Sequence, residues 1–208
     1  MVDQEKYYEA LCEGSMEKVK ELTQKALNEG ESPDKVLKGG LIPAMDRIGS
    51  RFRNNEIFIP EVLIAARAMH AGLGVLKPIL AKSTTSTTTK VVIGTVKGDL
   101  HDIGKNLVGM MLEGAGFEVV DLGIDVPPEK FIQSAKENGA KIIGMSALLT
   151  TTMMQMKTTV EKIKAEGLKV KTVIGGAPVT AEFAKQIGAD GYAPDAASAV
   201  STIKEISK

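Results

Sequence analysis

Residues 90–106, "KVVIGTVKGDLHDIGKN", join a short apolar run to a polar loop that contains two glycines. The run "KVVIGTV" is typical of a buried strand because it is rich in β-branched residues. In the loop that follows, Asp99 stands two places before His101, and Gly104 stands three places after it. A strand followed by such a loop and then by a helical pattern forms a βα unit, and this unit decides the fold of the second half of the chain.

The same pattern returns downstream. Further Val- and Ile-rich runs stand at 117–123, 141–148 and 171–177, with a weaker one near "GADGYA", and helical stretches stand at 104–115, 128–138, 152–165, 180–187 and 195–206. Alternating strands and helices predict an α/β domain with a flavodoxin- or Rossmann-like, doubly wound parallel sheet. In such a sheet the ligand binds outside the carboxyl ends of the strands, where the strand order reverses.

Upstream of this region the apolar residues recur at spacings of three and four, which indicates amphipathic helices. Ser15 and Ser32 are helix-capping candidates, and Pro33 and Pro60 stand where helices begin. We expect an N-terminal four-helix bundle over residues 1–85 and the α/β domain over 86–208. The threonine-rich run "AKSTTSTTTK", 81–90, is interpreted as a linker between them.

Composition limits the possible partners. Lys plus Arg and Asp plus Glu both number 26, so the formal net charge is zero, which argues against nucleic acid. Cys12 is the only cysteine, so neither a disulfide framework nor a cysteine metal site can form within the chain, and we expect it to be a small core residue. No apolar run approaches the roughly 20 residues of a membrane span. We therefore expect no membrane partner and a cytoplasmic location.

The loops after the first, third and fourth strands should meet at one edge of the sheet. These loops carry a histidine with an acid, a group of hydroxyl residues and a pair of glycines: Gly98, Asp99, His101, Asp102 and Gly104; Ser146, Leu148, Thr150 and Thr152; and Gly175, Gly176 and Ala177. Taken singly, His101 is as readily a polar loop residue, and the glycine pair is more readily an ordinary tight turn. Their combination on neighbouring strand ends favours a binding site.

His101 is the candidate metal ligand, since neutral imidazole binds transition metals. Asp99 can accept a hydrogen bond from its other ring nitrogen, and Thr152 can hold Asp99. One histidine cannot hold a bare metal ion, which normally takes three or four protein ligands. The metal must therefore bring its other ligands in a macrocycle, either haem or a corrinoid.

At this point the motif resembles a known family. Asp99-x-His101-x-x-Gly104, Ser146-x-Leu148 and Gly175-Gly176 resemble the cobalamin-binding fingerprint of base-off/His-on proteins. The stretch "VKGDLHDIGKN" is similar to the same loop of cobalamin-dependent methionine synthase, and "NEIFIPEVLIAARAM" is similar to that family's cap domain. The chain as a whole resembles the small corrinoid proteins of methanol, methylamine and methoxyaromatic methyltransferase systems.

The resemblance implies a cobalt corrinoid, cobalamin or a related cobamide, with His101 as the lower axial ligand and Asp99 and Thr152 completing a ligand triad. The family more often has serine in the place of Thr152. The remaining implied contacts fall into four groups: loop residues Leu100, Asp102 and Ile103; Ser146, Leu148 and Thr150 near the buried nucleotide base; Gly175, Gly176 and Ala177 along its tail, with Tyr192, Asp195 and Ala196 closing over the base; and Phe52, Ile59 and Val62 covering the upper cobalt face.

The function implied by the resemblance is that of a methyl carrier, cycling between Co(I) and methyl-Co(III). The implied partners are a donor methyltransferase, an acceptor methyltransferase and a reductive activase, and the chain alone is not expected to catalyse the transfer. Three alternatives remain: a corrinoid sensor, the small subunit of an adenosylcobalamin mutase, and a flavodoxin-like protein that binds no corrinoid. The methyl donor, the acceptor, the lower base and the oligomeric state are not encoded in any feature of the sequence.

Overall fold

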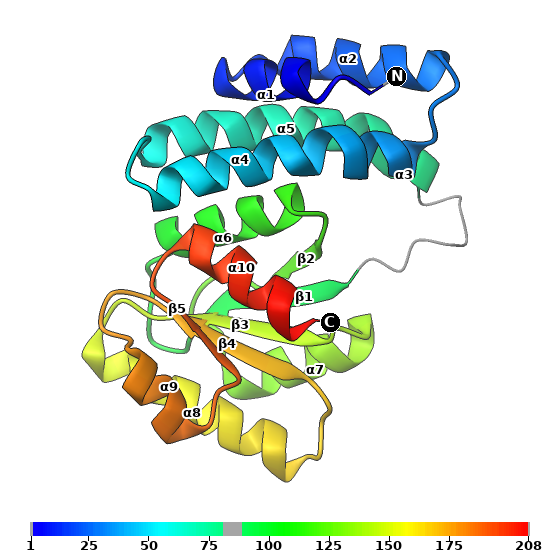
Figure 1. Ribbon diagram of the computed structural model, residues 1–208. Helices are drawn as coiled ribbons and strands as arrows, with labels where there is room; N and C mark the ends of the chain where they lie inside the picture. The colour runs from blue at the N-terminus through cyan, green and yellow to red at the C-terminus, as the bar shows by residue number, and fades with distance from the viewer. Residues whose placement is uncertain (1, 81–88, 208) are drawn as a thin grey trace. The chain divides into compact units, whose positions relative to one another are not determined.

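The computed structural model describes residues 2–80 and 89–207, and the chain divides into two compact units (Figure 1). One unit holds the first helices of the chain together with Met110–Gly116, and the other holds the sheet and the remaining helices. The helices of the first unit are α1 (Gln4–Cys12), α2 (Met16–Asn28), α3 (Pro33–Val36), the π-helical turn η1 (Leu37–Leu41), α4 (Ile42–Arg53) and α5 (Ile59–Leu80).

The helix starts in this unit follow from the capping residues. The hydroxyl oxygen of Ser15 accepts a hydrogen bond from the Lys18 N–H, and that of Ser32 accepts one from the Lys35 N–H. Each satisfies a backbone donor that the first turn of a helix leaves free. Both predicted caps are thereby confirmed.

The segment α3–η1–α4 is one continuous run of helical turns from Pro33 to Arg53. Within it, the Ile42 N–H donates to the Leu37 carbonyl, five residues back, which defines the π turn. The next residue, Pro43, has no N–H, and its ring would collide with the carbonyl four residues before it in a regular α-helix. The wider turn relieves this conflict, so the predicted third helix continues past its internal proline. The predicted four helices are therefore α1, α2, the continuous run α3–η1–α4, and α5.

Helix α5 is long and apolar enough, by length and composition, to cross a membrane. Its apolar side chains, however, make up much of the core of the helical unit: Val62, Ala65, Ala66, Ala68, Met69, Leu73 and Leu76 are all buried. Gly72 lets α2 come close, since a Cβ there would lie 2.8 Å from Val19 Cγ1. Part of the hydropathy of α5 therefore belongs to side chains packed inside the unit, while Ile59, Ile64 and Ile79 are exposed.

The second unit is built on a parallel sheet with the strand order β2-β1-β3-β4-β5 in the described residues. The strands are β1 (Lys90–Thr95), β2 (Glu118–Asp121), β3 (Ile142–Ser146), β4 (Lys171–Gly175) and β5 (Gly191–Ala193), and the helices are α6 (Ile103–Gly114), α7 (Pro128–Asn138), α8 (Thr150–Ala165), α9 (Ala181–Ile187) and α10 (Ala196–Ile206). Helices α6 and α10 cover one face, and α7, α8 and α9 cover the other (Figure 1). This is the doubly wound α/β fold that the sequence predicts, and the order reverses between β1 and β3.

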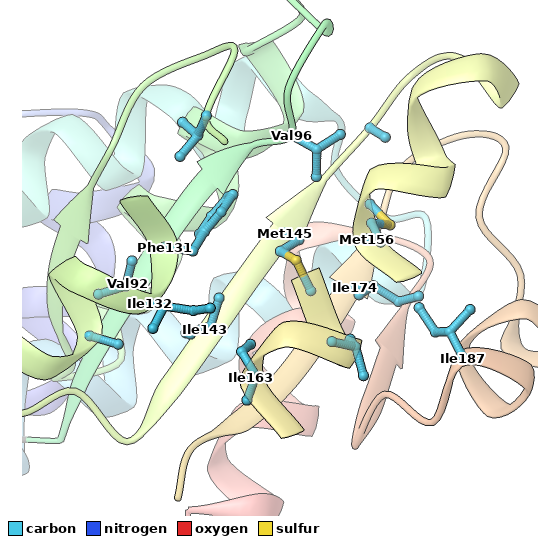
Figure 2. Packing of buried hydrophobic residues seen from close by; sticks show 14 of the residues in the cluster. Val92, Val96, Phe131, Ile132, Ile143, Met145, Met156, Ile163, Ile174 and Ile187 are labelled. Atoms are coloured by element: carbon cyan, nitrogen blue, oxygen red, sulfur yellow. The ribbon is translucent and has the colours of Figure 1, made fainter. Parts of the chain in front are cut away.

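The core beneath α7, α8 and α9 explains why the strand sequences are apolar without interruption. Val92, Ile143 and Ile174 point from neighbouring strands toward Phe131 of α7 and Met156 of α8 (Figure 2). The flanking strand residues Val91, Ile93 and Ile142 are buried as well. Strands buried on both faces carry no polar alternation.

Two smaller expectations are wrong. Cys12 is exposed at the end of α1 instead of lying in the core. His70, interpreted from the sequence as a residue at a helix end, lies in the middle of α5, where its Nε2 is 2.9 Å from Glu113 Oε2. The expected linker falls, for residues 81–88, outside the described residues.

Candidate functional site

The site is built where β1, β3 and β4 end. Thr95, Ser146 and Gly175 are paired across these strands, and Ala193 of β5 is paired with Gly175, so the loops that follow begin side by side. The sheet register thus brings together the loops that the sequence predicted to converge.

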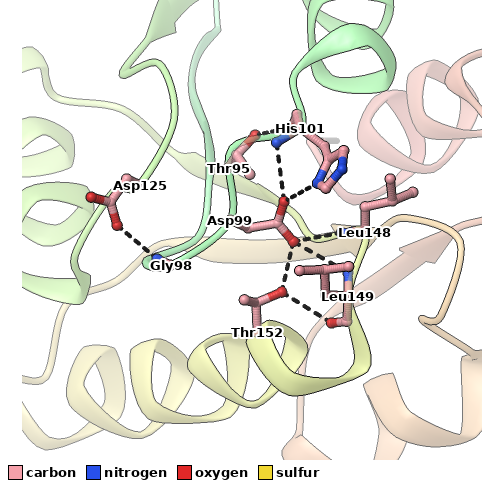
Figure 3. Close-up of polar contacts among 8 residues, drawn as sticks. All are labelled: Thr95, Gly98, Asp99, His101, Asp125, Leu148, Leu149 and Thr152. Carbon is pink, nitrogen blue, oxygen red and sulfur yellow. Dashed lines mark hydrogen bonds and ion pairs between the residues drawn. The ribbon is translucent and has the colours of Figure 1, made fainter.

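A relay of three side chains links two of these loops. His101 Nδ1 lies 2.8 Å from Asp99 Oδ1, and the Thr152 hydroxyl donates to Asp99 Oδ2 at 2.6 Å (Figure 3). Thr152 lies in the first turn of α8, which begins at Thr150, two residues earlier than the sequence indicated. The proposed triad of Asp99, His101 and Thr152 is therefore assembled in the structure.

Asp99 is fully buried and ionised. Besides His101 and Thr152, its carboxylate accepts hydrogen bonds from the backbone N–H groups of His101 at 3.1 Å, Leu148 at 2.8 Å and Leu149 at 3.2 Å. Burial alone would raise its pKa, but these donors, led by the Thr152 hydroxyl and the Leu148 N–H, hold the pKa well below the usual aspartate value. The relay therefore rests on a fixed negative charge.

That charge sets the tautomer of His101. A carboxylate accepts hydrogen bonds only, so Nδ1 must carry the proton that it donates to Asp99. The other ring nitrogen, Nε2, then has a free lone pair. The His101 side chain is 52% exposed, so this lone pair belongs to a ring that a ligand can reach. The arrangement is that of a metal-ligating histidine oriented by a carboxylate.

Backbone contacts hold the loop that carries His101. The Thr95 hydroxyl donates to the His101 carbonyl at 2.9 Å, and the Asp99 N–H donates to the Val96 carbonyl at 3.1 Å, closing a tight turn. Gly98 takes a left-handed conformation in this turn, with φ 82°.

The loop after β2 also reaches the site, and sequence reasoning missed it. The Asp125 carboxylate accepts a hydrogen bond from the Gly98 N–H at 2.7 Å. Nearby, the buried ammonium of Lys105 pairs with Asp121 at the end of β2 and donates to Asn106 Oδ1 at 2.6 Å. The available signal was the acidic residue in "GIDVPP", which directly follows a predicted strand.

The glycines of the motif serve different purposes. A Cβ on Gly176 would lie 1.9 Å from the Ala147 carbonyl oxygen, and one on Gly175 would lie 2.7 Å from the Ala193 carbonyl oxygen. Crowding of the protein's own backbone therefore already requires this pair to be glycine. Around Gly104, in contrast, nothing lies within 4 Å of such a Cβ, so only a ligand from outside could crowd that position.

The remaining predicted site residues are distributed as follows. Leu100, Ile103 and Leu148 are large apolar side chains exposed at 66%, 77% and 43%. The Asp102 carboxylate accepts a hydrogen bond from Asn106 Nδ2, and the Asp195 carboxylate caps α10 by accepting one from the Ser198 N–H. Of the others, two are half-buried (Ser146 and Tyr192), two are exposed (Thr150 and Ala177) and one is buried (Ala196). In the helical unit, Phe52 is half-buried, Ile59 is exposed and Val62 is buried.

These observations fit a metal held in a macrocycle. The described residues contain no group of three or more His, Cys, Asp or Glu side chains that could hold a metal ion by themselves. A planar group that supplies its own equatorial ligands needs one axial nitrogen, apolar side chains against its face and room for close approach. His101, the exposed pair Leu100 and Ile103, and the open space at Gly104 provide these features.

Comparison with known proteins agrees with this chemistry. Two family models match, each described as a B12 binding domain, over residues 89–201 and 3–77. The dimethylamine corrinoid protein of Methanosarcina barkeri is 46% identical, with 89% of this chain and 88% of the relative covered.

Solved structures are similar over nearly the whole chain. A cobalamin-binding protein from Desulfitobacterium hafniense DCB-2 is 34% identical, with a TM-score of 0.80 and 98% of each chain covered. A chain of the methanol:cobalamin methyltransferase complex MtaBC from Methanosarcina barkeri is 32% identical, with a TM-score of 0.85, covering 97% of this chain and 78% of that one.

Proposed function

This chain belongs to the B12-binding corrinoid proteins of methyltransferase systems, and from that premise we propose that it carries methyl groups from a donor methyltransferase to an acceptor methyltransferase. Its cofactor is a corrinoid. When bound, the corrinoid supplies the cobalt centre that accepts and releases the methyl group. The protein supplies the axial ligand and the surroundings of that centre.

We assign the lower axial position to His101 Nε2. The observation that carries this assignment is the buried Asp99 carboxylate, placed between His101 Nδ1 and the Thr152 hydroxyl. It fixes the protonated nitrogen, orients the ring and makes the ligating nitrogen a stronger electron donor.

The partners are proposed from the relatives. Several relatives are named as dimethylamine or trimethylamine corrinoid proteins, and one similar solved structure is a methanol:cobalamin methyltransferase complex. A methylamine or methanol methyltransferase is therefore the proposed donor partner, with a second methyltransferase as acceptor and a reductive activase. A cytoplasmic location, the lack of nucleic-acid or membrane partners, and the covering role of Phe52, Ile59 and Val62 remain predictions.

Reconstitution with cobalamin tests the proposal. The purified chain is loaded with cob(II)alamin, and its electron paramagnetic resonance spectrum is compared with that of His101→Ala. The chain carries 15N-labelled histidine, so wild type should show the doublet splitting of an axial 15N, whereas His101→Ala should show either no splitting or the triplet of the cofactor's own 14N base. Identical spectra would remove His101 as the ligand, and a chain that retains no corrinoid after gel filtration would overturn the proposed function.

The transfer step is tested with partners present. The loaded chain is first reduced to the Co(I) state with a low-potential chemical reductant and then mixed with candidate donor methyltransferases and methanol, dimethylamine or trimethylamine. Transfer of the methyl group to Co(I), with release of hydroxide or of the demethylated amine, is followed by the absorption spectrum of the cofactor. We expect methylation with one donor enzyme and its substrate, and none with the loaded chain alone. Methylation by the chain and substrate without any enzyme would contradict a carrier role.

A further inference from the structure

Asp125 has an uncommon backbone conformation. It lies in the loop between β2 and α7 with φ 53°, in the left-handed region that non-glycine residues rarely adopt. Among the described residues, Asn55 in the helical unit is the one other non-glycine residue with positive φ. Aspartate tolerates this conformation better than most residues, but it still has a conformational cost, and such positions gather at functional sites.

The contacts of Asp125 go to the loop that carries the proposed ligand. Its Oδ1 accepts from the Gly98 N–H at 2.7 Å, and its own N–H donates to the Asp99 carbonyl at 3.0 Å (Figure 3 shows the first). Asp125 therefore holds two consecutive residues, and the second of them bears the carboxylate that orients His101.

These two bonds extend a strand-like pairing between the loops. The Thr95 N–H donates to the Gly123 carbonyl and the Val126 N–H donates to the Thr95 carbonyl, each at 2.9 Å. Beyond Thr95 the chain turns sharply at Gly98, and that turn orients the Gly98 N–H toward the Asp125 carboxylate. The left-handed conformation of Asp125 lets both its side chain and its N–H face the turn.

We propose that Asp125 is a positioning residue for the axial ligand. Its hydrogen bonds to the Gly98 N–H and the Asp99 carbonyl fix the position of the Asp99 carboxylate, and this carboxylate in turn sets the direction of His101 Nε2. The inference rests on the proposed function. Asp125 contacts the loop backbone and makes no hydrogen bond to the imidazole, so it acts through Asp99.

Two substitutions separate the hydrogen bond from the backbone conformation. Asp125→Asn keeps an acceptor oxygen and tolerates positive φ, whereas Asp125→Gly keeps the backbone conformation and removes the acceptor. Asn55→Gly is the matched control, since it relaxes the other positive-φ position in a different unit. Each variant carries 15N-labelled histidine and is loaded with cob(II)alamin, and the fractions of cobalt with and without the doublet splitting of a histidine 15N are measured by electron paramagnetic resonance.

We expect Asp125→Gly to raise the ratio of His-off to His-on cobalt about fivefold, the effect of losing one hydrogen bond of typical net strength. Asp125→Asn and Asn55→Gly should remain within about twofold of wild type. A wild-type ratio in Asp125→Gly overturns the proposal. An equal rise in Asp125→Asn and Asp125→Gly also overturns it, because the shared acceptor would then have no role.

Hydrogen exchange of the cofactor-free chain tests the same inference independently. The His101 and Leu148 N–H groups both donate to the Asp99 carboxylate, and neither contacts Asp125 in a hydrogen bond. Their exchange should be about fivefold faster in Asp125→Gly than in Asp125→Asn. Equal rates overturn the positioning role even if the chain binds no corrinoid, whereas failure of corrinoid binding with unequal rates overturns only the proposed function.

Discussion

The third member of the relay is a threonine, and its extra methyl group has a place in the structure. A Cβ built on Gly98 would lie 3.6 Å from Thr152 Cγ2, so the methyl group lies alongside a position that carries no side chain of its own. The hydroxyl is thereby free to face Asp99, as a serine hydroxyl would be. Threonine at position 152, where the resembled family more often has serine, therefore keeps the hydrogen bond to Asp99.

Removing that hydroxyl should destabilise the chain even without cofactor. Thr152→Val keeps the shape but leaves the buried Asp99 carboxylate with one donor fewer, and we expect a loss of about 2 kcal/mol in the free energy of unfolding. Thr152→Ser, which keeps the hydroxyl, should lose less than about 1 kcal/mol. Urea unfolding of the three cofactor-free proteins measures both values.

The comparison of Val with Ser is the informative one. If Thr152→Ser is as unstable as Thr152→Val, the methyl contact and not the hydrogen bond to Asp99 is what stabilises α8 at this point. Equal stability of all three proteins would mean that the backbone donors of Leu148 and Leu149 suffice to hold the charge.

At the level of loops and strands, alanine substitution at Gly104, which has open space around it, and at Gly176, which is crowded by backbone, should have opposite effects on stability and on cobalamin binding. Gly104→Ala adds a methyl group to open space in the first turn of α6, so the free energy of unfolding should change by less than about 1 kcal/mol. The dissociation constant for cobalamin should nevertheless rise about tenfold, since the methyl group stands where we expect the corrinoid to approach.

Gly176→Ala is the contrasting variant. Its Cβ would collide with the Ala147 carbonyl at a backbone φ of 125°, so we expect a loss of at least about 3 kcal/mol in the free energy of unfolding without cofactor. Equilibrium unfolding and cobalamin titration of both variants check the pair. Unchanged cobalamin affinity in Gly104→Ala would exclude close approach at that residue.

The sequence predicted the strands and helices because their apolar periods are strong, and it predicted the Asp99–His101–Thr152 relay because loops at parallel strand ends must converge. It did not reveal what completes the relay. The Leu148 and Leu149 N–H groups donate from a chain segment about 50 residues away, and Asp125 acts across 27 residues. Backbone donors have no residue-type signature, and β3 ends at Ser146, earlier than its apolar run, so that the following segment can supply them.

At the scale of the whole molecule, one helix contributes to both units. The first residues of α6 belong with the sheet, and Met110–Gly116 belong with the helical unit, where Gly114 stands against Met45 and Met69. The helical period of α6 gives no indication of this division, because an apolar face looks the same whichever core buries it. Met111 is buried in the same unit, since a Cβ on Gly49 of α4 would lie 3.4 Å from Met111 Cε.

A fragment of residues 89–208 should therefore expose an apolar surface that the full chain hides. We expect it to bind the dye ANS more strongly than the full chain, and to unfold at lower urea concentration. Met111→Gln in the fragment should reduce dye binding. A fragment as stable and as dye-free as the full chain would contradict a shared helix.

The hydrogen bond from His101 to Asp99 has one more consequence, which concerns timing. The imidazole is oriented by contacts that form within the folded chain, so its rotational entropy is lost during folding and not during cofactor capture. The nitrogen proposed to bind the metal therefore already has its final direction before the cofactor arrives. Cobamides that differ only in their own nucleotide base should therefore find the same preoriented imidazole. The identity of that base should change the dissociation rate of the cofactor more than its association rate.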